Sequence, residues 1–233
     1  KKYVAMYKKI VLKKGKEESL QRQHPWVFSG AILKTDEPLE EGELVRVYTH
    51  DGEFMGVGHF QIGSISVRIL SFHDVPINAN FWQARLKAAM EVREAIDVIR
   101  PAEKVDTDKH NTVNTTYRLV HGEGDNLPGL IVDVYGTTCV MQAHSVGMHV
   151  SRYEIADALR NIMGDKIDSI YYKSETTLPF KAELGQENGF IYGNTDNDIA
   201  IENGLKCHID WLKGQQTGFF IDQRENRSLL EHY

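Results

Sequence analysis

The sequence predicts a small all-β domain, closed into a barrel, followed by an α+β domain. Three observations support this division: short alternating strands come first, the hydrophobic period changes to that of a helix near Phe81, and strand-like runs return after residue 116. The predicted units are residues 1–73 (the barrel), 74–80 (a linker), 81–213 (the α+β domain) and 214–233 (a connector).

The barrel is predicted from strand patterns that turns separate. Residues 42–48 alternate apolar and polar side chains with period two, which is typical of a half-buried strand. Asp51 and Gly52 follow as an Asp-Gly pair, which favours a hairpin turn, and further strand-like runs cover residues 54–60 and 65–70. Short strands at this spacing favour a small barrel.

The α+β domain begins where apolar side chains recur at helical spacing over residues 81–100, a run that Pro101 ends. Residues 101–116 are polar and irregular, so they are expected to form a loop. Several strand-like runs follow, together with a second expected helix over residues 147–163 that a glycine closes. An Asn-Gly pair at residues 203–204 predicts a hairpin near the end of the domain.

Composition narrows the class of protein. The chain has 233 residues, 41% of them hydrophobic, which is enough for one large or two ordinary domains with real cores. No apolar run is long enough to cross a bilayer and no signal-peptide pattern is present, so a cytoplasmic protein without a membrane partner is expected. Cys139 and Cys207 lie in apolar, strand-like runs and are expected to be buried, reduced thiols.

Charge is distributed unevenly along the chain. The net charge is −6, yet the first 34 residues hold nine Lys or Arg residues and only two acidic ones, Glu17 and Glu18. A basic arm on an acidic body suits the phosphates of nucleic acid. The residues predicted to contact RNA are Lys8, Lys9, Lys13, Lys14, Arg22 and His24. A lysine-rich strand edge that only prevents aggregation is the alternative.

Other motifs argue against further sites. The glycine-rich run 121–129 lacks the spacing of a dinucleotide loop and precedes a strand, so a rigid turn is expected, with a ligand loop as the alternative. The ten histidines form no zinc-ligand pattern, so no metal site is predicted. No catalytic residue is nominated, because no nucleophile motif occurs and neither cysteine is poised for reaction. The aromatic run 26–28 is interpreted as barrel core, with a base-stacking platform as the alternative.

The stretch from Gly214 to Arg227 has the densest group of candidate ligand-binding side chains. It is expected to lead from a strand into a helix that Asp222 caps, with Glu225 at capping-box spacing. Arg224 and Arg227 would then share one helix face and could hold an anionic or polar ligand. A capped helix entry with exposed arginines is the alternative.

Several segments resemble the RlmI-like ribosomal RNA methyltransferases. They are residues 16–32 together with 67–70, residues 117–136 and residues 214–227, which spread over most of the chain. The resemblance implies a PUA domain at the N-terminus, a central α+β domain, and a Rossmann-like catalytic domain that this sequence is expected to lack.

The resemblance also implies S-adenosyl-L-methionine as the methyl donor, large-subunit ribosomal RNA as the substrate and cytosine C5 as the methylated atom. A cysteine thiolate of the full protein would add to C6 of the base and make C5 nucleophilic. Within this chain, the implied cofactor contacts are confined to the lip of a cleft. They are Gln216, Thr217, Phe219, Asp222 and Arg224.

Different interpretations of these residues lead to different functions. In the first, the chain is the RNA-recognition and substrate-positioning part of a methyltransferase, is inactive alone, and is compatible with a homodimer. In the second, it is a complete, non-catalytic RNA-binding adaptor. A protein-interaction scaffold with no RNA role is a third alternative.

Overall fold

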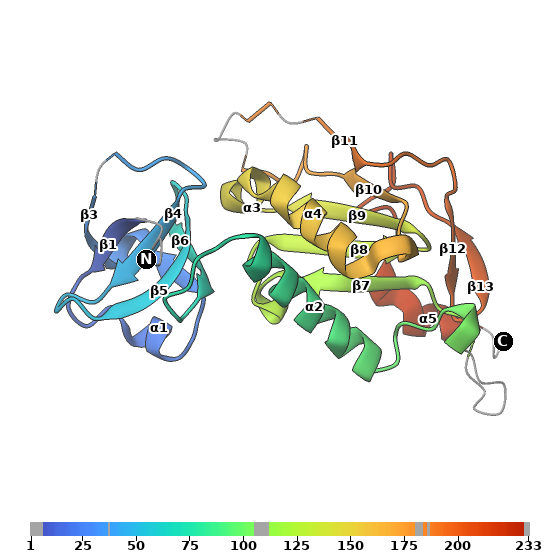
Figure 1. The fold of residues 1–233 in the computed structure, drawn as a ribbon, viewed down its shortest axis with the longest axis horizontal. Helices are drawn as coiled ribbons and strands as arrows, with labels where there is room; N and C mark the ends of the chain where they lie inside the picture. Colours follow the sequence, from blue (N-terminus) through green and yellow to red (C-terminus); the bar gives the residue numbers. More distant parts are fainter. Residues whose placement is uncertain (1–6, 37, 105–111, 180–183, 186, 231–233) are drawn as a thin grey trace.

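The computed structural model describes residues 7–36, 38–104, 112–179, 184–185 and 187–230. Figure 1 shows two lobes: the first part of the chain forms a curled sheet, and the rest forms a second sheet covered by helices. The order predicted from the sequence, a β domain followed by an α+β domain, is confirmed.

The first lobe is a six-stranded curled sheet with strand order β2-β6-β5-β4-β1-β3. Its strands are β1 (Lys8–Leu12), β2 (Trp26–Phe28), β3 (Ile32–Thr35), β4 (Leu44–Tyr48), β5 (Phe54–Phe60) and β6 (Ile65–Ser71). β1 and β4 are parallel, and the other described neighbours are antiparallel. A single helical turn, α1 (Glu18–Gln21), connects β1 to β2. Aliphatic side chains such as Ile10, Val45 and Val67 fill the core of the first lobe.

The second lobe is built on a mixed five-stranded sheet with strand order β11-β10-β9-β8-β7. Its strands are β7 (Thr116–His121), β8 (Leu130–Tyr135), β9 (Thr138–Ala143), β10 (Ser169–Tyr172) and β11 (Gly189–Tyr192). β9 and β10 are parallel, because the chain crosses over between them through α3 (Val146–Val150) and α4 (Arg152–Met163). The other neighbours are antiparallel.

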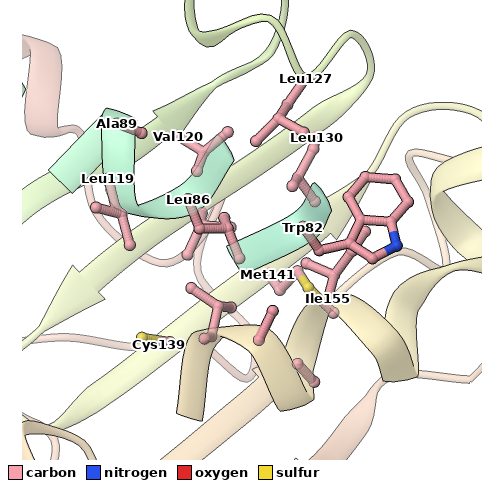
Figure 2. Close-up of a cluster of buried hydrophobic side chains, with 14 of the residues drawn as sticks. Trp82, Leu86, Ala89, Leu119, Val120, Leu127, Leu130, Cys139, Met141 and Ile155 are labelled. Atoms are coloured by element: carbon pink, nitrogen blue, oxygen red, sulfur yellow. The ribbon is translucent and has the colours of Figure 1, made fainter. Parts of the chain in front are cut away.

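The helices α2 (Ala79–Ala95) and α4 lie across one face of this sheet (Figure 1). Figure 2 shows Trp82, Leu86 and Ala89 of α2 pointing toward buried side chains of the sheet and of α4. Burial of each large apolar side chain of this kind stabilises the fold by about 1.5–3 kcal/mol. This helix-covered face therefore holds the main core of the lobe.

Both expected helices differ in detail from the structure. The first starts before residue 81, because the Asn78 side chain accepts a hydrogen bond from the Phe81 amide (3.2 Å) and caps α2 at Ala79, and it ends at Ala95 instead of residue 100. The second, expected as one helix over residues 147–163, is divided at Ser151 into α3 and α4. Of the loop expected at residues 101–116, residues 105–111 lie outside the described part of the chain.

A hairpin covers the opposite face of the sheet. It comprises β12 (Ile199–Glu202) and β13 (Leu205–His208), with Asn203 and Gly204 at positive φ angles of 48° and 84° in the turn. Successive side chains of a strand point to opposite faces, so Tyr135 and Val140 reach this side and pack with Ala200 and Trp211. The hairpin predicted from the Asn-Gly pair is confirmed.

The two lobes meet in a closely packed junction. The His59 ring of β5 is buried, stacks on Trp82 (ring centroids 6.2 Å apart) and places Nε2 3.2 Å from the Ser151 hydroxyl. A Cβ atom on Gly147 would lie only 2.1 Å from Cγ of His59, so this contact requires glycine. In the described residues, no helix has the length and apolar character needed to cross a membrane.

Candidate functional site

The C-terminal segment (residues 214–227) lies on the hairpin-covered face of the second sheet. Phe219 and Ile221 pack against the cluster that contains Tyr135 and Trp211. The backbone of the segment is tightly folded at its start, because Gly214 donates to the Asp210 carbonyl (2.8 Å) and a Cβ on Gly218 would clash with the same residue. The segment is therefore part of the folded lobe.

A buried hydrogen-bond network attaches this segment to the sheet. Asp133 of β8 is fully buried, and Arg118 of β7 donates to both of its oxygens (2.8 and 3.0 Å). Thr217 donates its hydroxyl to the same carboxylate (2.6 Å), so the Tyr135 hydroxyl, also 2.6 Å away, must donate to Thr217. Hydrogen bonding to Asp133 raises the pKa of Arg118, and burial raises the pKa of Tyr135.

A second set of contacts places both arginines of the segment beside one carboxylate. Arg227 donates to both oxygens of the buried Glu202 carboxylate (2.6 and 2.8 Å), and Arg224 lies 3.7 Å from it. Arg224 also donates to the Thr116 carbonyl. Hydrogen bonding to Glu202 raises the pKa of Arg227, whereas burial lowers the pKa of Arg224. The anionic group that the two arginines hold is therefore a side chain of the hairpin.

The predicted cap of the last helix is wrong. Asp222 is exposed and lies in a 3-10 helix, Ile221–Gln223, that precedes α5 (Arg224–Leu229). The start of α5 is thereby displaced beyond Asp222, its N-cap is Gln223, and no side chain accepts a capping hydrogen bond.

The five predicted cofactor contacts fall into two groups. Thr217 is fully buried in the Asp133 network, while Phe219 and Arg224 are half-buried. The Phe219 ring lies edge-on to Tyr135 and beneath the Arg227 guanidinium, which is 4.2 Å from the ring centroid. Gln216 and Asp222 are exposed, and the carbonyl of Gln216 accepts a hydrogen bond from the Gln142 amide (3.1 Å).

Sequence reasoning missed the partners that hold the segment in place. They are Arg118, Asp133, Tyr135 and Glu202. Arg118 and Asp133 face each other across the antiparallel pair β7–β8, so a known strand register would have indicated the first ion pair. No pattern in the sequence around Thr217 or Glu202 indicates which distant residue each of them contacts.

The predicted RNA-contact residues lie on the first lobe, most of them exposed. Lys9, Lys13, Lys14, Arg22 and His24 are exposed, and Lys8 is half-buried. Lys8 forms an ion pair with Glu43 (3.0 Å), and Lys13 donates to the Gly30 carbonyl (2.9 Å). These are weak surface contacts, so they do not prevent the ammonium groups from reaching phosphate.

The aromatic run of β2 is only partly core, which corrects the interpretation from sequence. Val27 is buried, but Phe28 is 47% exposed and Trp26 is half-buried. The rings of Trp26 and Phe28 lie side by side, with centroids 6.3 Å apart, on the side of the strand away from the core. The ring of His24 lies edge-on to Trp26, with centroids 5.2 Å apart.

The remaining motifs carry no reactive group in the described chain. Burial raises the pKa of the Cys139 thiol to about 12. Cys207 is half-buried on the hairpin, not buried as expected, and burial also raises its pKa. The run 121–129 forms the expected turn between strands, and no cluster of His, Cys, Asp and Glu suited to a metal ion occurs in the residues described.

Comparison with known proteins defines the class first. A family profile described as a PUA-like domain matches residues 10–72, the strands of the curled sheet. Two solved structures share the fold over 95% of this chain and 53% of theirs, at 21% identity. They are a candidate methyltransferase, SMU.776, complexed with SAH (TM-score 0.72), and a candidate SAM-dependent methyltransferase from Streptococcus mutans (TM-score 0.71). The architecture is therefore a PUA-like domain followed by an α+β domain.

Sequence relatives identify the family more closely. The ribosomal RNA large subunit methyltransferase I of Aeromonas salmonicida is 34% identical over 228 residues, which cover 96% of this chain and 54% of that protein. The methyltransferase I of Vibrio campbellii is 34% identical, again over 96% of this chain and 54% of the relative. The chain is homologous to these methyltransferases over almost all of its own length and spans about half of theirs.

Proposed function

We propose that this chain is the RNA-recognition and substrate-positioning part of an S-adenosyl-L-methionine-dependent methyltransferase that acts on large-subunit ribosomal RNA. The observation that carries the proposal is homology over 96% of the chain to proteins named ribosomal RNA large subunit methyltransferase I. Cytosine C5 is the proposed methylated atom, in accordance with the resemblance described above. A cytoplasmic location and a homodimer stay predictions.

The proposed division of labour follows the units 1–73, 74–80, 81–213 and 214–233. The curled sheet would bind the RNA backbone through Lys8, Lys9, Lys13, Lys14, Arg22 and His24, which lie at its surface. The second lobe packs against the first at the His59 junction, so it would hold bound RNA near the C-terminal segment.

The C-terminal segment fits the edge of a cofactor site rather than a complete one. Its arginines are turned toward Glu202 and Thr217 is buried, which leaves Gln216, Asp222 and the edge of Phe219 for contact with a ligand. The relatives are nearly twice as long as the aligned part, and we assign the Rossmann-like domain, with most of the cofactor site, to that remainder. The cofactor would supply the methyl group, and Asp133 and Glu202 would keep the lip in position.

The first prediction is that RNA binding by the chain depends on salt through the lysines of β1 and the turn after it. Substituting Lys9, Lys13 and Lys14 together with glutamine is expected to reduce the slope of log K against log salt by about 2, because each phosphate contact with a single strand contributes about 0.7. Fluorescence anisotropy with a ribosomal RNA fragment between 50 and 200 mM salt measures the slope.

The matched control replaces three exposed lysines of the second lobe, Lys87, Lys166 and Lys206, with glutamine. The net charge of the chain changes by the same amount in both triple variants, but the slope for the control variant is expected to stay at the wild-type value. Equal slopes for both triple variants would contradict the assignment of the RNA surface to the first lobe.

The second prediction is that the 233-residue chain transfers no methyl group. Incubation with tritiated S-adenosyl-L-methionine and unmodified ribosomal RNA is expected to leave the RNA unlabelled, because Cys139 is buried with a raised pKa and Cys207 is not activated. A full-length relative serves as the positive control. Labelling of RNA by this chain would refute its role as a positioning part and place the catalytic site within it.

A further inference from the structure

A cavity of about 220 Å³, lined by both polar and apolar side chains, lies between the two lobes. Arg68 of β6 lines it from the first lobe, and the turn between β7 and β8 contributes Gly122, Glu123 and Gly129. His144, which follows β9, forms another part of its wall. The cavity is therefore built from both lobes and is separate from the exposed lysines and from the C-terminal segment.

The side chains around this cavity offer both hydrogen-bond donors and acceptors. Arg68 is half-buried and donates to the Gln61 amide oxygen at 3.4 Å, which is a long hydrogen bond. One oxygen of Glu123 accepts from the Trp26 indole (2.9 Å), which leaves the other for a ligand. The His144 ring makes no hydrogen bond to any residue that the structure describes.

The charges of the cavity favour a neutral polar ligand over a bare phosphate. Burial lowers the pKa of Arg68, and the nearby Glu123 carboxylate opposes this shift. The positive charge of the guanidinium and the negative charge of the carboxylate therefore offset each other in the cavity. A phosphate placed beside Arg68 would also lie near Glu123 and be repelled by it. A nucleobase is uncharged and presents donors and acceptors along one edge, which matches this pair.

An aromatic strip leads to the same cavity. Trp26 of the edge strand β2 donates to Glu123, and the Phe28 ring lies next to it with centroids 6.3 Å apart. His24 extends the strip on the other side of Trp26. Exposed rings beside a basic surface are typical of proteins that stack the bases of single-stranded RNA.

We propose that the cavity between Arg68, Glu123 and His144 binds one unpaired nucleobase of the RNA while a neighbouring base stacks on Trp26 or Phe28. This inference rests on the proposed RNA-binding function and adds to it a site that reads bases rather than phosphates. It places single-stranded RNA across the junction, where both lobes contact the same strand.

Binding of a ten-nucleotide single-stranded RNA is to be compared with binding of an abasic oligonucleotide of equal length and charge. The RNA is expected to bind about tenfold more tightly, since stacking of one base contributes about that much. Trp82 and Trp211 are buried and Trp26 is half-buried, so quenching of tryptophan fluorescence by RNA reports on the strip. The base held in the cavity is expected to add to this preference, and Arg68→Met is expected to remove the added part and leave only the preference that stacking contributes.

Two further variants make the test decisive. Arg160→Met removes one positive charge from α4 in the second lobe and is expected to leave the preference unchanged. His144→Ala truncates an exposed side chain, so it tests the cavity even where Arg68→Met lowers stability. Equal affinity for RNA and abasic strand in the wild type would overturn the base site and leave phosphate binding standing. Absence of binding to both strands would reject the proposed RNA function itself.

Discussion

Replacing Asp133 with alanine is expected to lower the free energy of unfolding by about 3 kcal/mol. Breaking a buried ion pair from one side typically costs about 3–5 kcal/mol, because the remaining charge stays desolvated without its partner. The lower end applies here because the Arg118 side chain is 28% exposed and can be partly hydrated. Thr217 also loses its acceptor, and Tyr135 loses the orientation of the hydroxyl to which it donates.

Urea denaturation followed by circular dichroism measures this change, with Asp222→Ala as the control. Asp222 is an aspartate of the C-terminal segment that is exposed, so its loss is expected to change stability by less than about 0.5 kcal/mol. RNA affinity of Asp133→Ala is expected to stay at the wild-type value under conditions where the variant is folded. Similar stabilities of the two variants would show that the network does not hold the C-terminal segment.

Acidification from pH 6.5 to pH 4 is expected to remove about 3 kcal/mol of stability through His59 alone. Burial, helped by the positive charge of Arg68, lowers the pKa of His59 from 6.5 to about 4. In this range the unfolded chain binds a proton that the folded chain does not bind. Protonation therefore favours unfolding, and each pKa unit corresponds to about 1.4 kcal/mol. The contribution is complete above pH 6.5 and is lost progressively below it.

The pH dependence of unfolding in wild type and in His59→Phe isolates this effect. Phenylalanine keeps a ring against Trp82 but cannot titrate, so the variant is expected to lose about 3 kcal/mol less than the wild type between pH 6.5 and pH 4. His149, whose pKa burial also lowers to about 4, contributes equally to both proteins. The exposed His50→Gln serves as a control with the wild-type profile. Parallel profiles for wild type and His59→Phe would contradict a buried, neutral His59.

Much of the fold was predictable because it depends on neighbouring residues. Strand alternation, the helical period that begins near Phe81 and the Asn-Gly turn at residues 203–204 each depend on residues only a few positions apart in the sequence. The prediction that Asp222 caps the last helix was wrong for a local reason as well, since a 3-10 helix precedes α5 and displaces the start of α5 beyond Asp222. Exposure of Phe28 could not be predicted, because alternation shows which side chains share a face but not which face meets the core.

The candidate sites depended far more on the tertiary structure. By itself, the sequence determined the order of the two domains, the basic N-terminal arm and the polar character of residues 214–227. Only the fold decided that Thr217 binds Asp133, 84 positions away, that Arg224 and Arg227 lie beside Glu202, and that Arg68 and Glu123 line one cavity. The physical reason is that turn and period preferences are properties of adjacent residues. Pairing between distant charges is instead set by strand register and by the packing of one lobe against the other.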